Sequence, residues 1–184
     1  MQKLGTERLI LRNFQKQDFD NYFELIKMKN VNIRMGINKE FSCDEIEERF
    51  NKVLKDNFCF AIELKENSKV IGQVNITADE GNAEVLGIEP IKACNVNYCI
   101  NERYWGRGFA TEAMKEILKF IFSKLNKEIV FAGYFDKNIS SGRVLEKCGF
   151  EIWGKIKNAK IWYEDDRPTD LIWTKLYKEK FIIQ

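Results

Sequence analysis

The sequence predicts one α+β domain, built on a mixed, mostly antiparallel sheet of about six to seven strands flanked by helices. Three observations support this prediction. Short apolar runs typical of strands recur in the first half of the chain. From residue 109 the apolar spacing changes to three and four residues, which is typical of a long helix. Two more strand-like runs close the chain, and no repeat or linker divides it, so residues 1–184 are expected to form a single domain.

The chain is expected to begin with a strand and two helices. Residues 8–12 are apolar and extended in character, and residues 17–28 carry apolar side chains at helical spacing. Ser42 and Glu45 have the spacing of a capping box, in which each side chain accepts a hydrogen bond from the other residue's backbone. The second helix should therefore start there and end near residues 56–57.

Three strand-like runs follow these helices. Residues 58–64 and 70–76 are separated by a short polar stretch, which predicts a hairpin. Residues 94–100 alternate larger with smaller side chains and continue the antiparallel series. The order between residues 79 and 89 is not assigned, and Pro90 favours a turn close by.

The strongest helical pattern begins at Phe109. Its apolar positions are Ala110, Ala113, Met114, Ile117, Leu118, Ile121, Phe122 and Leu125. A strand at 129–135 comes next. A strand, helix, strand order implies a parallel crossover or a strand beside its predecessor.

The last third of the chain is expected to hold a short helix and two strands. Ser140 or Ser141 is suited to cap the helix, and Gly149 stands where its C-terminus needs a positive φ. The closing strands are predicted at 150–156 and 171–177.

Charge and hydropathy exclude several classes of function. The 30 basic residues are nearly offset by 28 acidic ones, giving a net charge of +2 with no basic face for nucleic acid. No apolar run is long enough to cross a bilayer, and the first residues lack the core of a signal peptide. We therefore expect a cytoplasmic protein without a nucleic-acid or membrane partner.

Cysteine and histidine usage narrows the chemistry. The chain has five isolated cysteines, without the paired spacing of a zinc or redox site, and buried reduced thiols are expected. It has no histidine, which removes Ser-His-Asp and Cys-His nucleophiles. Proton transfer is left to carboxylates, tyrosines, amines or water, and no metal is expected.

A glycine pair marks the start of the long helix. Gly106 and Gly108 follow a strand and precede that helix, so bare backbone amides there can approach a phosphate closely. Arg103, Arg107 and Thr111 add charge and a hydroxyl group at a spacing suited to a diphosphate. The alternative is a tight turn with ordinary surface arginines. The third glycine of a dinucleotide fingerprint and the Gly-Lys-Ser/Thr end of a P-loop are both missing.

These residues resemble a known family. Arg103-x-x-Gly106-x-Gly108 is similar to the Q/R-x-x-G-x-G/A acetyl-CoA motif of the GNAT N-acetyltransferases, and residues 104–113 resemble its RimJ/RimL-like branch. Residues 138–150 resemble the second hallmark of that branch, and residues 6–12 and Asp170 also agree. The resemblance spans nearly the whole chain and implies the GNAT fold.

The resemblance also implies a cofactor site. Acetyl-CoA would be the co-substrate, and its diphosphate would lie against backbone amides of Gly106, Arg107, Gly108, Phe109, Ala110 and Thr111, beside Arg103. The strand ending at Cys99 and Ile100 would pair with the pantetheine arm, with Asn138 on the other side. An amide near Cys99 or Ile100 would polarise the thioester carbonyl, as in an oxyanion hole.

Two positions depart from the family pattern. Many members carry a tyrosine acid where this chain has Leu145, and a glutamate base where it has Asn95. Branch members have a serine at the position of Ser141 that is thought to hydrogen-bond the departing sulfur; the alternative for Ser141 is the helix cap. The base stays open among Glu84, Glu89, Tyr98, Tyr134, Asp136 and water.

The resemblance implies direct attack of a primary amine on acetyl-CoA in a ternary complex. The acceptor is a protein N-terminus or a small amine. An α-amine is neutral in about one molecule in six at pH 7 and a lysine amine in about one in 2,500, so weak base machinery favours a peptide N-terminus or another amine of low pKa. The alternatives are a CoA-binding sensor without turnover or, more remotely, a domain that does not bind CoA. A homodimer is open, and Trp162 and Tyr163 are candidates for acceptor contact or core packing.

Overall fold

The computed structural model describes residues 3–162 and 166–182 and divides the chain into two compact units. The first unit holds Met1–Asn75 and Tyr98–Glu116, and the second holds Ile76–Asn97 and Ile117–Gln184. Both units share the strands β4 (Val70–Ala78) and β5 (Ala93–Ile100) and the helix α5 (Phe109–Ser123).

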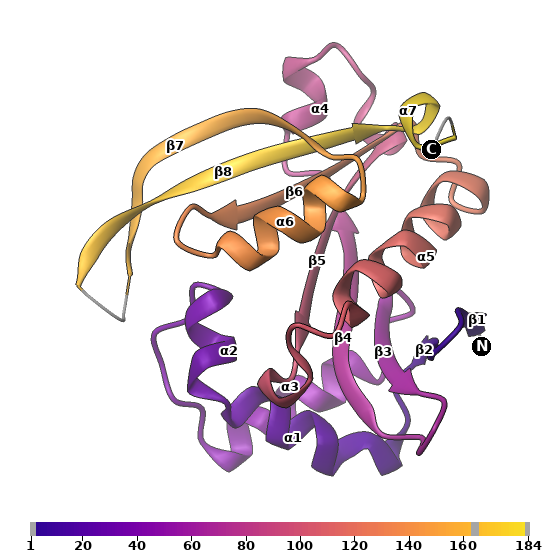
Figure 1. Cartoon of the computed structure of the whole chain (residues 1–184), viewed down its shortest axis with the longest axis vertical. Coiled ribbons are helices and arrows are strands. Elements are labelled where there is room, and N and C mark those ends of the chain that lie inside the picture. Colours follow the sequence, from indigo (N-terminus) through magenta and orange to yellow (C-terminus); the bar gives the residue numbers. More distant parts are fainter. Residues whose placement is uncertain (1–2, 163–165, 183–184) are drawn as a thin grey trace. The chain divides into compact units, whose positions relative to one another are not determined.

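The described residues form eight strands, hydrogen-bonded in the order β1-β2-β3-β4-β5-β6-β8-β7 (Figure 1). The remaining bounds are β1 (Lys3–Gly5), β2 (Leu9–Asn13), β3 (Cys59–Leu64), β6 (Ile129–Phe135), β7 (Glu151–Trp162) and β8 (Arg167–Tyr177). Strands β5 and β6 are parallel, and the pairs β1–β2, β2–β3, β3–β4, β6–β8 and β7–β8 are antiparallel. This confirms the predicted α+β class with a mixed, mostly antiparallel sheet and a parallel crossover through α5.

The predicted number of strands was too low because β1 carries no apolar pattern. It is three residues long, and Leu4 is its only apolar side chain. Strands β7 and β8 also run well past their predicted bounds, into a polar stretch that has no apolar alternation. Backbone pairing extends this hairpin, with a register shift between Ile156 and Lys160.

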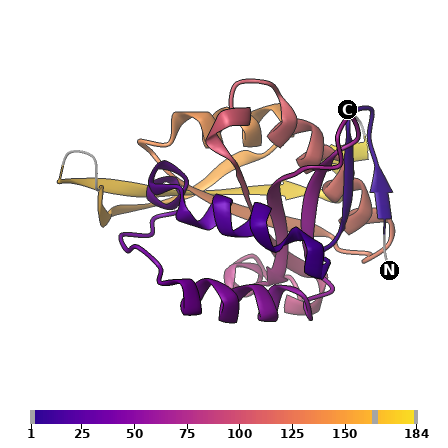
Figure 2. The ribbon, with the colours of Figure 1, turned by 90° about the horizontal axis from the view of Figure 1, so that it is seen from below.

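Helices of the first unit include one that was not predicted. The expected helix over 17–28 is a 3₁₀ turn, η1 (Lys16–Asp18), followed by α1 (Phe19–Lys27). Met28 is extended, with φ −73° and ψ 111°, and a new helix, α2 (Lys29–Arg34), starts after it. Helix α3 (Cys43–Val53) lies beside α1 (Figure 2) and begins with the predicted capping box of Ser42 and Glu45.

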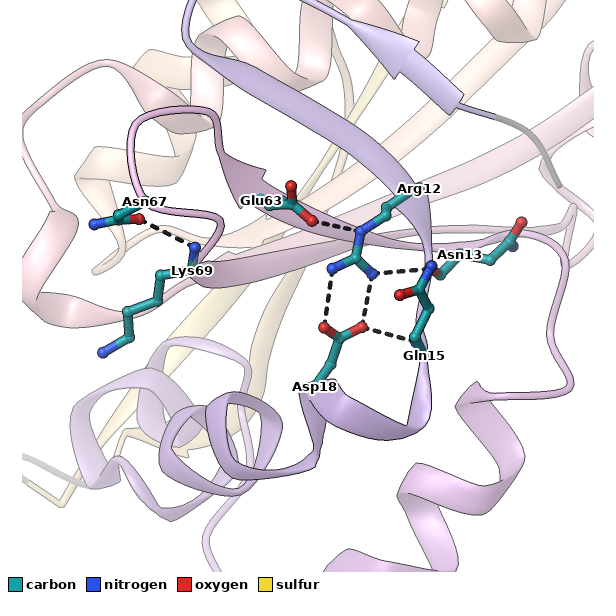
Figure 3. A network of polar contacts seen from close by, with 7 residues as sticks. All are labelled: Arg12, Asn13, Gln15, Asp18, Glu63, Asn67 and Lys69. Carbon is teal, nitrogen blue, oxygen red and sulfur yellow. Dashed lines mark hydrogen bonds and ion pairs between the residues drawn. The ribbon is translucent and has the colours of Figure 1, made fainter.

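Two groups of contacts hold the first unit together. Aromatic rings from α1, α3 and the end of β2 pack in one core, with the ring centroids of Tyr22 and Phe50 5.1 Å apart. Below β2, Arg12 donates to both carboxylate oxygens of Asp18 at 2.7 and 2.9 Å and also donates to Glu63 (Figure 3). This bidentate geometry ties β2 to β3 and to the turn that opens α1.

The described residues of the second unit have their own core and include four short helices. These are α4 (Asn82–Val85), η2 (Pro90–Lys92), α6 (Ile139–Lys147) and α7 (Lys178–Ile182). Its core contains the fully buried Phe131, against which Trp153 and Trp173 pack. Pro90 begins η2, which agrees with the turn expected there.

The cap of α6 differs from the prediction. Asn138 is the N-cap, and its Oδ1 accepts from the backbone N–H of Ser141 at 3.3 Å and from the hydroxyl of Ser140 at 2.8 Å. The two serines therefore lie in the first turn, and the assignment of the cap to either of them is wrong. In the described part of the chain, no helix has the length and apolar character to cross a membrane.

Candidate functional site

The predicted phosphate-binding loop connects β5 to α5 through a 3₁₀ turn, η3 (Glu102–Tyr104). Asn101 caps this turn by accepting from the N–H of Arg103 at 3.0 Å. Gly106 and Gly108 have φ values of +73° and +82°, a left-handed conformation that other residues rarely adopt. Phe109 then begins α5, so the loop ends at the N-terminus of a 15-residue helix. The first N–H groups of a helix have no partner within the helix, and together with the helix dipole they favour an anion there.

The loop has a partner that the sequence reasoning missed. Arg8, just before β2, donates from Nη1 to the carbonyl oxygen of Arg107 at 3.0 Å, and its guanidinium carbon lies 4.5 Å from the ring centre of Phe109. Its other donors bind Glu112. Arg8 and Glu112 are far apart in sequence, so only the resemblance of residues 6–12 to the family hinted at a role.

The two arginines of the motif behave differently. Arg107 lies over the loop's aromatic residues, with its guanidinium carbon 5.7 Å from the Tyr104 ring centre and 5.5 Å from that of Phe109. Arg103 pairs instead with Glu24 of α1 at 3.0 Å. It also lines an open cavity of about 630 Å³ beside α1. The predicted contact of Arg103 with a phosphate therefore competes with an existing ion pair.

The end of β5 is held tightly against β4. The N–H of Asn101 donates to the carbonyl of Ile71 at 2.8 Å. A Cβ atom on Gly72 would lie only 2.3 Å from the carbonyl oxygen of Cys99, so this close approach requires glycine. Because neighbouring residues of a strand present their peptide groups to opposite edges, those of Ile100 face away from β4. Its carbonyl accepts from the indole N–H of Trp105 at 2.7 Å.

The parallel ladder between β5 and β6 is short. It pairs Ala93, Cys94 and Asn95 with Ile129, Val130 and Phe131. Among the described residues no further pair of these two strands is found, although β5 continues to Ile100 and β6 to Phe135.

Asn138 and Ser141, the other predicted site residues, belong to the second unit. Asn138 is 7% exposed, and its Oδ1 is engaged in capping α6. Asn138 supplies the cap of α6, which removes the helix-cap alternative for Ser141. The sulfur-binding role of Ser141 stays a prediction. Leu145, which replaces the tyrosine acid, is 1% exposed and part of the core.

Among the candidate bases, Asp136 already has a structural use. Its Oδ1 accepts from the hydroxyl of Thr169 at 2.6 Å and from the N–H of Asp170 at 3.2 Å, which ties β6 to β8. Glu84 and Glu89 are exposed on α4 and before η2. Asn95 is 7% exposed, and its Oδ1 has no hydrogen-bond partner within the described residues.

The thiols of Cys94 and Cys99 do not provide a nucleophile. Burial raises the pKa of Cys99 to about 12 and that of Cys94 to about 12, so both stay protonated near neutral pH. Cys99 can therefore act only through its backbone. No cluster of Cys, Asp or Glu in the described ranges is arranged to hold a metal ion.

Trp162, a candidate for acceptor contact, is 3% exposed, with its ring centre 6.1 Å from that of Phe135. This favours the core-packing alternative. Tyr163 lies outside the described residues.

Comparison with known proteins identifies relatives over most of the chain. Residues 8–151 match the family described as Acetyltransferase (GNAT) domain. The chain is 25% identical over 175 residues to the uncharacterized N-acetyltransferase YoaA of Bacillus subtilis strain 168, covering 91% of this chain and 92% of that protein.

Two solved structures share the fold. Spermidine N-acetyltransferase from Vibrio cholerae, in complex with CoA and spermine, superimposes with a TM-score of 0.78 at 22% identity over 96% of this chain and 99% of that one. Ribosomal-protein-S5-alanine acetyltransferase from Vibrio fischeri gives a TM-score of 0.74 at 20% identity over 98% of this chain and 99% of that one.

Proposed function

Since the chain belongs to the GNAT acetyltransferase family, we propose that it is an acetyl-CoA-dependent N-acetyltransferase, which moves the acetyl group of acetyl-CoA to a primary amine. One observation carries the proposal. Gly106 and Gly108 adopt left-handed backbone directly before the 15-residue α5, inside an Arg-x-x-Gly-x-Gly motif. A loop of this conformation presents its amides to a diphosphate.

Different site residues bind different parts of acetyl-CoA. The amides from Gly106 to Thr111 bind the diphosphate, with Arg107 supplying positive charge. The outward-facing peptide groups of β5 pair with the pantetheine arm. As the family resemblance implies, Asn138 binds that arm from its other side.

The reaction is a direct displacement. The neutral amine nitrogen attacks the carbonyl carbon of the thioester, and the tetrahedral intermediate collapses by breaking the C–S bond. The N–H of Ile100 stabilises the oxyanion, a contribution of about 3 kcal/mol in comparable sites. Ser141 hydrogen-bonds the departing sulfur, and the amine's proton passes to water.

The acceptor we favour is a peptide N-terminus, in line with the RimJ/RimL-like resemblance. Its α-amine is neutral far more often than a lysine side chain near pH 7, so it needs less help from a base. A small amine such as a polyamine, amino acid or antibiotic is the alternative; the solved structures of the same fold include a spermidine N-acetyltransferase and a ribosomal-protein-S5-alanine acetyltransferase.

The test is thiol release from acetyl-CoA against a panel of N-terminal peptides, polyamines, aminoglycosides and amino acids, with CoA binding followed by calorimetry. Turnover on the peptides supports the proposal. Turnover confined to a small amine would reject the peptide assignment.

Ser141→Ala tests the sulfur contact. We expect kcat to fall about tenfold, with the dissociation constant of acetyl-CoA changed less than twofold, because the contact strengthens as the thiolate develops. Ser123→Ala, at an exposed residue at the C-terminal end of α5, serves as the control. An unchanged kcat for Ser141→Ala would remove this residue from the mechanism.

A CoA-binding sensor is the second candidate, favoured by Leu145 and Asn95 at the positions of the family's acid and base. It predicts tight CoA binding with no turnover on any amine of the panel.

A further inference from the structure

Arg8 is bound on two sides at once. Its Nε and Nη2 reach Oε2 of Glu112 at 2.7 and 2.6 Å, and its own N–H donates to Oε1 at 2.9 Å. The hydroxyl of Thr6 donates to the same Oε1 at 2.5 Å. Glu112 is thus fully hydrogen-bonded, and it fixes the plane of the guanidinium group.

The fixed guanidinium group leaves Nη1 for the loop. Nη1 donates to the carbonyl oxygen of Arg107, which belongs to the same peptide group as the N–H of Gly108. In a planar trans peptide the C=O and N–H bonds point in opposite directions. Holding the Arg107 oxygen at Arg8 therefore turns the Gly108 N–H away from Arg8.

Without this contact the peptide has freedom to rotate. It joins Arg107 to Gly108, and glycine adopts both signs of φ with little energy difference, so φ of Gly108 can change. Arg107 and Gly108 are exposed, so neighbouring side chains do not hold the peptide from outside. The loop's conformation depends on hydrogen bonds of this kind.

We propose that Arg8 is a positioning residue of the cofactor site, which aims the Gly108 N–H at the diphosphate of CoA by holding the Arg107 carbonyl, with Glu112 and Thr6 keeping Arg8 in place. This inference rests on the proposed function. It predicts that Arg8 acts on the diphosphate end of CoA and leaves the pantetheine end unaffected.

Arg8→Lys separates position from charge. Lysine keeps the positive charge beside Glu112, but one ammonium group does not span both Glu112 and the Arg107 carbonyl. We expect the dissociation constant of CoA, measured by calorimetry, to rise about tenfold. That of pantetheine, which lacks the diphosphate, should change less than twofold. Lys92→Ala is the matched control, because Lys92 forms an ion pair of the same 2.6 Å length with Glu128 in the second unit.

Glu112→Gln gives an independent test, because a charge effect and a positioning effect of Glu112 predict opposite changes in the affinity for CoA. If Glu112 acted only through its charge, removing it would tighten the binding of an anion nearby. Glutamine has one acceptor oxygen where Glu112 has two, so it cannot accept both from Nε and Nη2 of Arg8 and from the Arg8 N–H and the Thr6 hydroxyl. We therefore expect weaker CoA binding. This variant also serves if Arg8→Lys does not fold, which thermal unfolding will show.

The outcomes are distinct. Unchanged CoA affinity in Arg8→Lys, or tighter binding in Glu112→Gln, would overturn the positioning role. Equal losses for CoA and pantetheine would assign Arg8 a general structural role and also overturn it. Wild-type protein that fails to bind CoA would reject the proposed function and this inference with it.

Discussion

Gly72 on β4 is a position where one methyl group should damage both stability and catalysis. A Cβ atom there would lie 2.3 Å from the carbonyl oxygen of Cys99 and 3.1 Å from Cα of Ile100. Both obstacles are backbone atoms of β5, so no side-chain rotation relieves the clash. For Gly72→Ala, β5 must move away from β4 by about 1 Å to reach an ordinary 3.4 Å contact.

The geometry sets the size of the effect. Overpacking a well-packed site costs about 1–3 kcal/mol, and a backbone clash belongs at the upper end. The free energy of unfolding should fall by about 3 kcal/mol, which lowers Tm by about 6–12 °C in a chain of this size. If the Ile100 N–H binds the oxyanion, a displacement of about 1 Å should also lower kcat about 100-fold.

Urea unfolding and steady-state rates measure these two effects. Gly154→Ala in β7 is the control, because a Cβ atom there meets nothing within 4 Å. The control should stay within about 0.5 kcal/mol of wild type. The reasoning is refuted if Gly72→Ala matches Gly154→Ala in stability, since β5 would then not lie against Gly72 as described.

Three further predictions concern buried charge, pH and thiols. Asp18→Ala should lower the free energy of unfolding by about 3 kcal/mol, because Arg12 loses its bidentate partner. Urea unfolding checks this, with Asp20→Ala at an exposed residue as the control. Burial alone would raise the pKa of Glu112, but hydrogen bonds and its ion pair outweigh burial and lower it. The ionised Glu112 therefore stabilises the fold fully above pH 4.5, its ordinary pKa, and this stabilisation is lost as pH falls through the lowered pKa. The difference in free energy of unfolding between wild type and Glu112→Gln should shrink over that pH range. A difference that stays constant with pH would contradict this prediction. Cys43 is the exposed one of five free cysteines, so a thiol reagent should label one site rapidly in native protein, and none in Cys43→Ser.

Much of the fold can be read from local patterns. The capping box at Ser42 and the apolar stripe of α5 are closely spaced or periodic patterns. Each was predicted correctly because its residues act within one helix. The left-handed glycines before α5 are equally local. Nothing else in the chain needs to be known to place Gly106 and Gly108 at a helix start.

The remainder depends on contacts between distant segments. Arg8 and Glu112 meet only once β2 and α5 are folded, and each looks like a surface charge in the sequence. Asn138 competes with two serines for the same cap, and backbone geometry decides the outcome. Strand β1 has too few apolar residues for a pattern and exists because β2 offers it a hydrogen-bonding edge.

The central claim is that acetyl moves from acetyl-CoA to an amine without resting on the protein. Mass spectrometry of the protein incubated with acetyl-CoA and the acceptor panel tests it most directly. We predict that one class of amine gains an acetyl group while the protein stays unmodified. The account would be contradicted if CoA binds but every amine of the panel stays unmodified. It would also be contradicted by an acetyl group on a cysteine of the chain.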